Sequence, residues 1–129
     1  MSKSADQRQS GERIRFLERE GKRILLVDLS KCTAREVEET THRVPDVVTA
    51  EPRGSALILT DFSGSSFDEA ALRAIKETAV FDKAFVKKSA LVGILSLPRE
   101  FHNEMEKFSR RDFAIFGTRE DALQWLVQS

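Results

Sequence analysis

The chain has 129 residues, the length of one ordinary domain and too short for two full-sized ones. Its 21 Lys and Arg residues balance its 21 Asp and Glu residues, so no bulk electrostatic attraction to nucleic acid or to an anionic membrane is expected. A single cysteine, Cys32, excludes an internal disulfide, and no apolar run approaches the ~20 residues of a membrane helix. We therefore expect a cytoplasmic protein without membrane insertion.

Residues 1–12 are mostly polar and are predicted to be a disordered tail ahead of one folded domain over residues 13–129. The loose alternation that begins at Ile14 and Phe16 predicts an edge strand. Residues 24–27 form a continuous apolar run, which is typical of a strand covered on both faces. Turn chemistry around Gly21 separates the two segments, so an antiparallel hairpin is expected.

A helix is predicted to start after Thr33, because Thr33 and Glu36 have the spacing of a capping box. Apolar residues follow at helical spacing, at Val37, Val44 and Val48. Pro45 lies inside this pattern and is expected to end or kink the helix near Val44, because proline lacks the amide proton and clashes with the preceding turn.

Residues 56–59 form a second fully apolar strand, and residues 90–95 a third. Between them, Ser66 and Glu69 have the spacing of a second capping box. The buried stripe expected for the helix that follows consists of Leu72, Ile75 and Ala79.

The last third of the chain contains two more helices and a short strand over residues 113–116. Pro98 suits the first position of a helix that carries Phe101, Met105 and Phe108 on one face. Thr118 is expected to cap the final helix, whose core face consists of Ala122, Trp125 and Leu126.

The resulting order is β-β-α-β-α-β-α-β-α. Strands that alternate with helices imply an α/β fold with a mostly parallel five-stranded sheet built from right-handed crossovers. The first strand is expected to be an antiparallel edge strand.

This order resembles the STAS superfamily of sulfate transporter tails and anti-sigma-factor antagonists, and residues 57–64 resemble its apolar strand and Asp-Leu-Ser-Gly type turn. Residues 85–93 and 116–126 are similar to segments of bacterial STAS/SEC14 proteins of the stage II sporulation protein AA-like group. The resemblance covers roughly residues 13–127 and implies a STAS-like fold and a non-catalytic module. The SEC14 part of the name implies lipid binding by analogy.

The sequence departs from the anti-sigma-factor antagonists at their phosphorylatable serine. Acidic residues and alanines occupy the matching positions within residues 67–72, while Ser65 and Ser66 lie just upstream of them. Partner switching by phosphorylation at that site is therefore not implied.

One loop joins the carboxyl end of the second apolar strand to the next helix, where open α/β sheets bind ligands. It supplies the candidate ligand or partner residues Asp61, Ser63, Gly64, Ser65 and Ser66. Its backbone amides could receive an anion. Alternatively, Ser66 caps the helix, Gly64 makes the turn and Asp61 accepts hydrogen bonds from loop amides.

No catalytic or metal-binding set is evident. Asp28 and Asp61 end strands expected to be neighbours, but the acidic pair and the lysine of a phosphate-accepting receiver domain are missing. Cys32 lacks a second cysteine, and His42 and His102 do not have metal-ligand spacing. We expect no metal, no cofactor and a bystander thiol.

A basic and aromatic stretch precedes the third apolar strand and consists of Phe81, Lys83, Phe85, Lys87 and Lys88. Such a stretch could contact RNA or lipid headgroups, as could Arg110 and Arg111. Because the net charge is zero, we expect solvated charges beside core phenylalanines, and no nucleic-acid partner.

Three functional hypotheses remain. The first is a non-enzymatic STAS-like regulatory module that binds a protein partner or a small ligand. The second is a carrier or sensor of an apolar or lipid-like ligand in a SEC14-like pocket. The third is an enzyme centred on Asp61 with Ser65 or Ser66, although the sequence places no general base beside either serine.

Overall fold

The computed structural model describes residues 13–93, 99 and 113–128. Three predictions lie outside these residues: the tail over residues 1–12, the helix opened by Pro98, and the position of His102. Arg110 and Arg111 also lie outside them.

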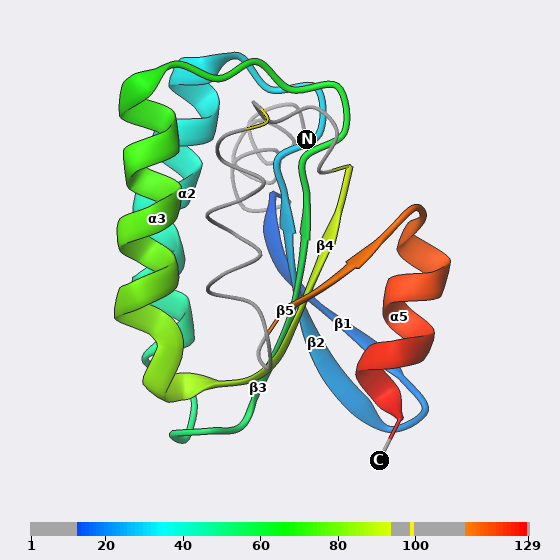
Figure 1. Ribbon diagram of the computed structural model, residues 1–129. Coiled ribbons are helices and arrows are strands. Elements are labelled where there is room, and N and C mark those ends of the chain that lie inside the picture. The colour runs from blue at the N-terminus through cyan, green and yellow to red at the C-terminus, as the bar shows by residue number, and fades with distance from the viewer. Residues whose placement is uncertain (1–12, 94–98, 100–112, 129) are drawn as a thin grey trace, which may run out of the picture.

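The five strands form one sheet in the order β1-β2-β3-β4-β5 (Figure 1). β1 (Ile14–Arg19) pairs antiparallel with β2 (Lys22–Asp28). β3 (Ala56–Asp61), β4 (Val86–Val92) and β5 (Phe113–Phe116) continue the sheet in parallel. The expected mostly parallel sheet with an antiparallel first edge strand is confirmed.

The hairpin between β1 and β2 closes through a two-residue loop. Arg19 pairs with Lys22 across the turn, and the two residues between them, Glu20 and Gly21, have φ angles of +52° and +79°. Positive φ at both central positions is the mark of a type I′ turn, whose twist matches that of the two strands. This turn sets the register of the edge strand.

Helices cover both faces of the sheet (Figure 1). α2 (Ala34–Val48) and α3 (Glu69–Asp82) pack side by side on one face, and α5 (Arg119–Val127) lies on the other. A 3-10 turn, η1 (Lys83–Phe85), joins α3 to β4.

The core has two halves because successive strand residues point to opposite faces. Leu25 and Val27 of β2 pack in the half that includes α2 and α3, whereas Ile24 and Leu26 pack in the half that includes α5. This division explains why the central strands are continuously apolar.

The prediction that Pro45 ends or kinks α2 near Val44 is wrong about the ending, because the helix continues to Val48, and the kink stays a prediction. The backbone amide of Thr49 still donates to the Pro45 carbonyl at 2.9 Å. Val48 is fully buried in the same core as Val44. Burying that apolar side chain outweighs the single amide hydrogen bond that the proline removes. The capping box of Thr33 and Glu36 is confirmed.

The predicted cap of α3 is also wrong, because Asp68 replaces Ser66. The Asp68 carboxylate accepts from the Ala71 amide at 2.8 Å, and the helix starts at Glu69. The Ser66 amide donates instead to the Cys32 carbonyl, which holds Ser66 in the preceding loop. Aspartate caps a helix as well as serine does, so the loop contact decides where α3 begins.

Candidate functional site

Asp28 and Asp61 lie side by side where β2 and β3 end, as their register shows. Arg119, the first residue of α5, contacts both carboxylates. Its Nε lies 2.6 Å from Asp61 Oδ2, and one of its terminal nitrogens lies 3.1 Å from Asp28 Oδ1. The expected neighbourhood of the two aspartates is confirmed, but a cation from the same chain occupies the space between them.

Each aspartate also holds the loop that follows it. Asp61 Oδ1 accepts from the Ser63 amide at 2.9 Å, and Asp28 Oδ1 accepts from the Ser30 amide at 3.0 Å and from its hydroxyl at 2.5 Å. Partial burial acts to raise the pKa of Asp28, but the hydrogen bonds from Ser30 and the charge of Arg119 outweigh it and hold that pKa below its ordinary value. The lowered pKa favours the ionised form of Asp28 as it anchors its loop.

The strand-end loops, residues 29–33 and 62–68, are tied to each other by backbone hydrogen bonds. The amides of Leu29 and Lys31 donate to the carbonyls of Asp61 and Ser63 at 2.9 and 2.8 Å. The Ser65 hydroxyl also donates to the Leu29 carbonyl. These contacts make the two loops one connected unit.

Gly93 fits closely against the second strand-end loop. Its φ is +75°, and a Cβ at this position would lie 2.5 Å from the Ser63 nitrogen and 2.7 Å from its Cα. Real Cβ atoms essentially never approach that closely, so the backbone path here requires glycine.

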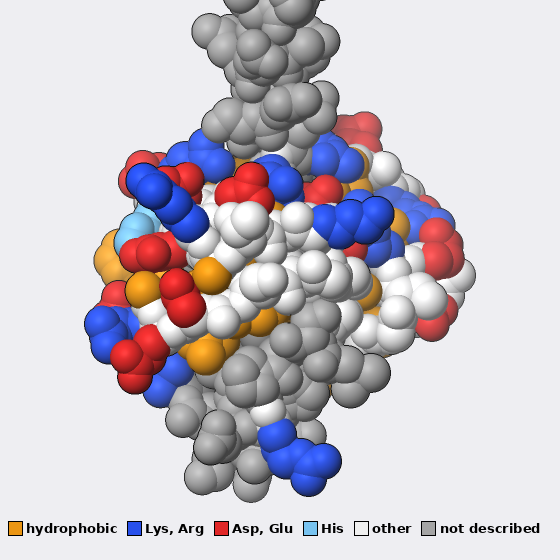
Figure 2. All heavy atoms as spheres, turned by 90° about the horizontal axis from the view of Figure 1, so that it is seen from above, with side chains coloured by type: hydrophobic (Ala, Val, Ile, Leu, Met, Phe, Trp, Pro, Cys, Tyr) orange, Lys and Arg blue, Asp and Glu red, His pale blue; other side chains and the backbone are white. Residues whose placement is uncertain are grey.

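The second strand-end loop carries four of the five residues proposed from sequence as a ligand or partner loop, and the fifth, Asp61, is the last residue of β3. Asp61 accepts a loop amide as expected, and Gly64 has the turn-forming φ of +70°. Figure 2 views the molecule from this end, where basic and acidic side chains mingle. Within the described part of the chain, no three His, Cys, Asp or Glu side chains are placed to hold a metal ion. Recognition by this loop stays a prediction.

Cys32 belongs to the first strand-end loop and is 2% exposed. Burial raises the pKa of its thiol, so the reactive thiolate is disfavoured at neutral pH. His42 is exposed on α2.

The apolar cavity is a second feature, which lies away from the predicted loop. It has a volume of about 200 Å³ and lies in the core between the sheet and the two helices α2 and α3. Its lining is mostly apolar, with contributions from β2, β3, β4, α2 and α3, for example Val27, Ile58, Leu91, Val44 and Ile75. The cavity is partly open to the surface, where the exposed residues Val80 and Lys83 line it.

The lining also contains six polar or charged residues, Thr41, Thr60, Thr78, Asp82, Lys83 and Ser89. Thr41 of α2 and Asp82 at the end of α3 are each 4% exposed. Among the residues that the structure describes, neither Thr41 Oγ1 nor Asp82 Oδ1 has a hydrogen-bond partner. Burial raises the pKa of Asp82 to about 6. Buried polar groups are normally paired, so both of these need an explanation.

The sequence analysis missed Arg119, Asp82 and Thr41. Asp82 had a detectable signal, because an acidic residue in the last turn of a helix faces the negative end of the helix dipole. Thr41 stands four residues before Pro45, at the position whose carbonyl that proline cannot reach. Arg119 had no local signal, since its two partners are distant in sequence.

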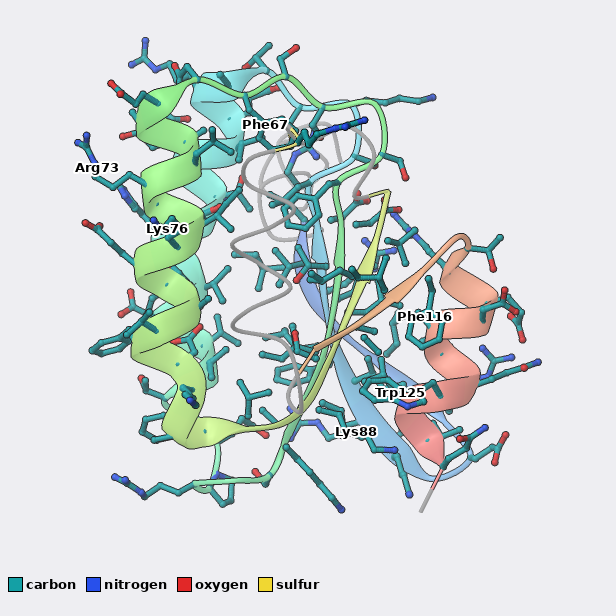
Figure 3. All side chains as sticks on the ribbon, in the orientation of Figure 1. Phe67, Arg73, Lys76, Lys88, Phe116 and Trp125 are labelled. Atoms are coloured by element: carbon teal, nitrogen blue, oxygen red, sulfur yellow. The ribbon has the colours of Figure 1, made fainter. Side chains whose placement is uncertain are left out.

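The basic and aromatic stretch differs from expectation in two respects. Lys88 Nζ donates to the carbonyls of Trp125 and Gln128 at 3.0 and 2.8 Å and lies 4.8 Å from the centre of the Trp125 ring, which in turn packs against Phe116 (Figure 3). It therefore binds the end of α5 while its side chain stays partly exposed. Phe81 is 61% exposed and is not a core residue.

None of the described helices is both long enough and apolar enough to cross a membrane.

Comparison with known proteins identifies the fold. Neither a protein-family model nor a curated protein matches the chain. A solved structure does match: an uncharacterized protein from the DUF3478 family with a SpoIIAA-like fold, from Shewanella loihica PV-4. The likeness has a TM-score of 0.67 at 18% sequence identity and covers 88% of this chain and 91% of that one. The chain therefore has the SpoIIAA-like fold that its sequence resemblance implied.

Proposed function

We propose that this protein is a non-enzymatic regulatory module that binds a small, largely apolar ligand in the cavity beneath α2 and α3. The observation that carries the proposal is the cavity itself, a void of about 200 Å³ with an apolar lining. An engineered apolar cavity of ~150 Å³ in another protein stays dry and binds benzene. A void of this kind therefore favours an apolar occupant over water.

The volume also limits the ligand. It is comparable to the ~150 Å³ of the engineered cavity that holds one benzene ring. A single ring or a short aliphatic chain fills such a space, whereas a lipid with two acyl chains does not fit. The expected ligand therefore occupies a pocket, as in the carrier hypothesis, but it is smaller than a lipid.

The contacts at the strand-end loops support the non-enzymatic part of the proposal. Asp61 binds Arg119, and the Ser65 hydroxyl donates to a backbone carbonyl. A nucleophilic serine needs a base that accepts its proton, and a carbonyl in that position cannot serve as one. These side chains hold the loops together, which is a structural role.

Nuclear magnetic resonance of the methyl groups tests the proposed function. Ethylbenzene titrated into the protein should shift the methyl signals of cavity residues such as Val44, Ile58 and Leu91 in a saturable way. Ala79 also lines the cavity, and its replacement by methionine should fill the space and abolish the shifts. Ala84→Met is the matched control, because Ala84 is exposed.

The absence of saturable shifts for ethylbenzene at its solubility limit would overturn the proposal. Equal binding by the Ala79→Met and Ala84→Met variants would do so as well, because binding would then occur elsewhere. Circular dichroism of both variants establishes that they are folded. If Ala79→Met does not fold, nuclear Overhauser effects from ethylbenzene to the cavity methyls of the unmodified protein locate the ligand instead.

A further inference from the structure

We infer that the ligand of the apolar cavity is a small amine, whose hydrocarbon part fills the void and whose ammonium group binds Asp82. The inference rests on the proposed function and adds the chemical class of the ligand. It is carried by two buried oxygens at the cavity, Thr41 Oγ1 and Asp82 Oδ1, which have no hydrogen-bond partner among the described residues.

Asp82 cannot be explained as a helix cap. It is the last residue of α3, where the helix leaves carbonyl groups free and no amides that a carboxylate could accept from. It also stands at the N-cap position of η1, yet its side chain makes no capping hydrogen bond there. The negative end of the α3 dipole further disfavours a carboxylate at this place. Local structure therefore gives Asp82 no stabilising role.

Thr41 presents a second unmatched group on the facing helix. A threonine inside a helix commonly donates its hydroxyl to a carbonyl one turn back, but the Thr41 hydroxyl has no partner among the described residues. Pro45, one turn ahead, has no amide proton for the Thr41 carbonyl. Oxygen atoms that lack donors thus occur on both helices beside the cavity.

The unpaired oxygens of Thr41 and Asp82 favour a ligand that donates hydrogen bonds. An ammonium group carries three donors and no acceptor, and a positive charge compensates a buried carboxylate. The other charged residue of the described lining is Lys83, which is exposed and adjacent to solvent. A ligand carboxylate would meet Asp82 as a like charge, so acidic ligands are excluded.

Four compounds of similar shape test the inference by calorimetry and methyl shifts: 2-phenylethylamine, 2-phenylethanol, ethylbenzene and 3-phenylpropionate. We expect the amine to bind at least about tenfold more tightly than the alcohol, the usual range for a charged hydrogen bond. The acid should bind most weakly. Binding of the amine should also lower the pKa of Asp82, which carboxyl carbon shifts report directly.

Asp82→Asn should remove the preference for the amine while ethylbenzene still binds. Glu77→Gln is the matched control, because Glu77 is an exposed acidic residue on the same helix. It should keep the full preference.

If ethylbenzene binds but the amine gains less than twofold over the alcohol, the inference is overturned and the proposed function stands. A preference that persists in Asp82→Asn overturns it equally. If none of the four compounds reaches the cavity, the proposed function fails and the inference fails with it.

Discussion

Asp82 lowers the stability of the folded protein at neutral pH. A carboxyl whose pKa is raised to about 6 on folding binds its proton more tightly in the native state than in the unfolded chain. The free energy of unfolding therefore decreases as the pH rises from about 4 to above 6. A buried ionisable group that destabilises the fold beside a cavity is typical of a binding site.

Replacing Asp82 by asparagine should stabilise the protein at pH 7. The variant has no charge to desolvate, so we expect a gain of about 1 to 3 kcal/mol in the free energy of unfolding. The gain should shrink to about 0.5 kcal/mol at pH 4, because the wild-type carboxyl is then protonated in the native state and roughly half protonated in the unfolded chain. Urea denaturation at the two pH values measures both effects, and an equal gain at pH 4 would contradict this explanation.

Gly93 tests how tightly the strand-end loops are packed. Gly93→Ala should destabilise the protein both through its positive φ and through the clash with Ser63. Gly21→Ala is a matched control with a similar φ and nothing near its Cβ. We expect about 1 kcal/mol of destabilisation for Gly21→Ala and at least about 2 kcal/mol more for Gly93→Ala, measured by denaturation. Equal losses of stability in the two variants would show that the loop moves to make room for the added methyl group.

At the level of secondary structure, cationic side chains hold α5 against the sheet at both ends of the helix. Arg119 binds the two aspartates at its start, and Lys88 binds the carbonyls of Trp125 and Gln128 at its end. The second arrangement complements the negative end of the helix dipole. Apolar residues of α5 then complete the core half that it covers.

Arg119→Ala should destabilise the protein by about 1 to 2 kcal/mol, because Asp61 is 5% exposed and would lose its cation, while solvent screens part of the pair. Arg35→Ala, which removes an exposed pair with Glu39, should have a much smaller effect. The folded-state pKa of Asp28 is lowered, so its contribution is present above the unfolded value and is lost as the pH falls through the folded value. The difference between wild type and Arg119→Ala should therefore shrink as the pH falls below the ordinary pKa of an aspartate carboxyl.

Pro45 destabilises α2, because the proline supplies no amide hydrogen bond inside the helix. Pro45→Ala should stabilise the protein by about 1 to 3 kcal/mol, because it restores an amide donor for the Thr41 carbonyl inside a continuous helix. A thermal melt measures the change. A lower melting temperature would show that the proline ring contributes more through its packing than its missing donor costs.

At the scale of the whole molecule, the sheet and its covering helices were predictable from sequence because their signals are local. The run at residues 24–27 and the hairpin turn at Gly21 each identify their own element. The errors arose where a distant contact decided the outcome. Ser66 lost its capping role to a contact with Cys32, and Val48 kept α2 intact beyond Pro45.

The candidate site was less predictable than the fold. The register of β2 and β3 allowed Asp28 and Asp61 to be placed together, but Arg119 comes from the far end of the chain. A cavity depends on what neighbouring side chains fail to fill, and no pattern in the sequence reports that. Asp82 became conspicuous only once its surroundings were known.

The cavity gives the two halves of the core different compressibility. Unfolding under hydrostatic pressure is favoured when it eliminates internal voids, and the apolar cavity lies in the half beneath α2 and α3. High-pressure spectroscopy should therefore find that signals of Val44 and Ile75 change at lower pressure than those of Leu59 and Leu126. A bound occupant should bring the two sets together, since it would take up the volume that pressure otherwise removes.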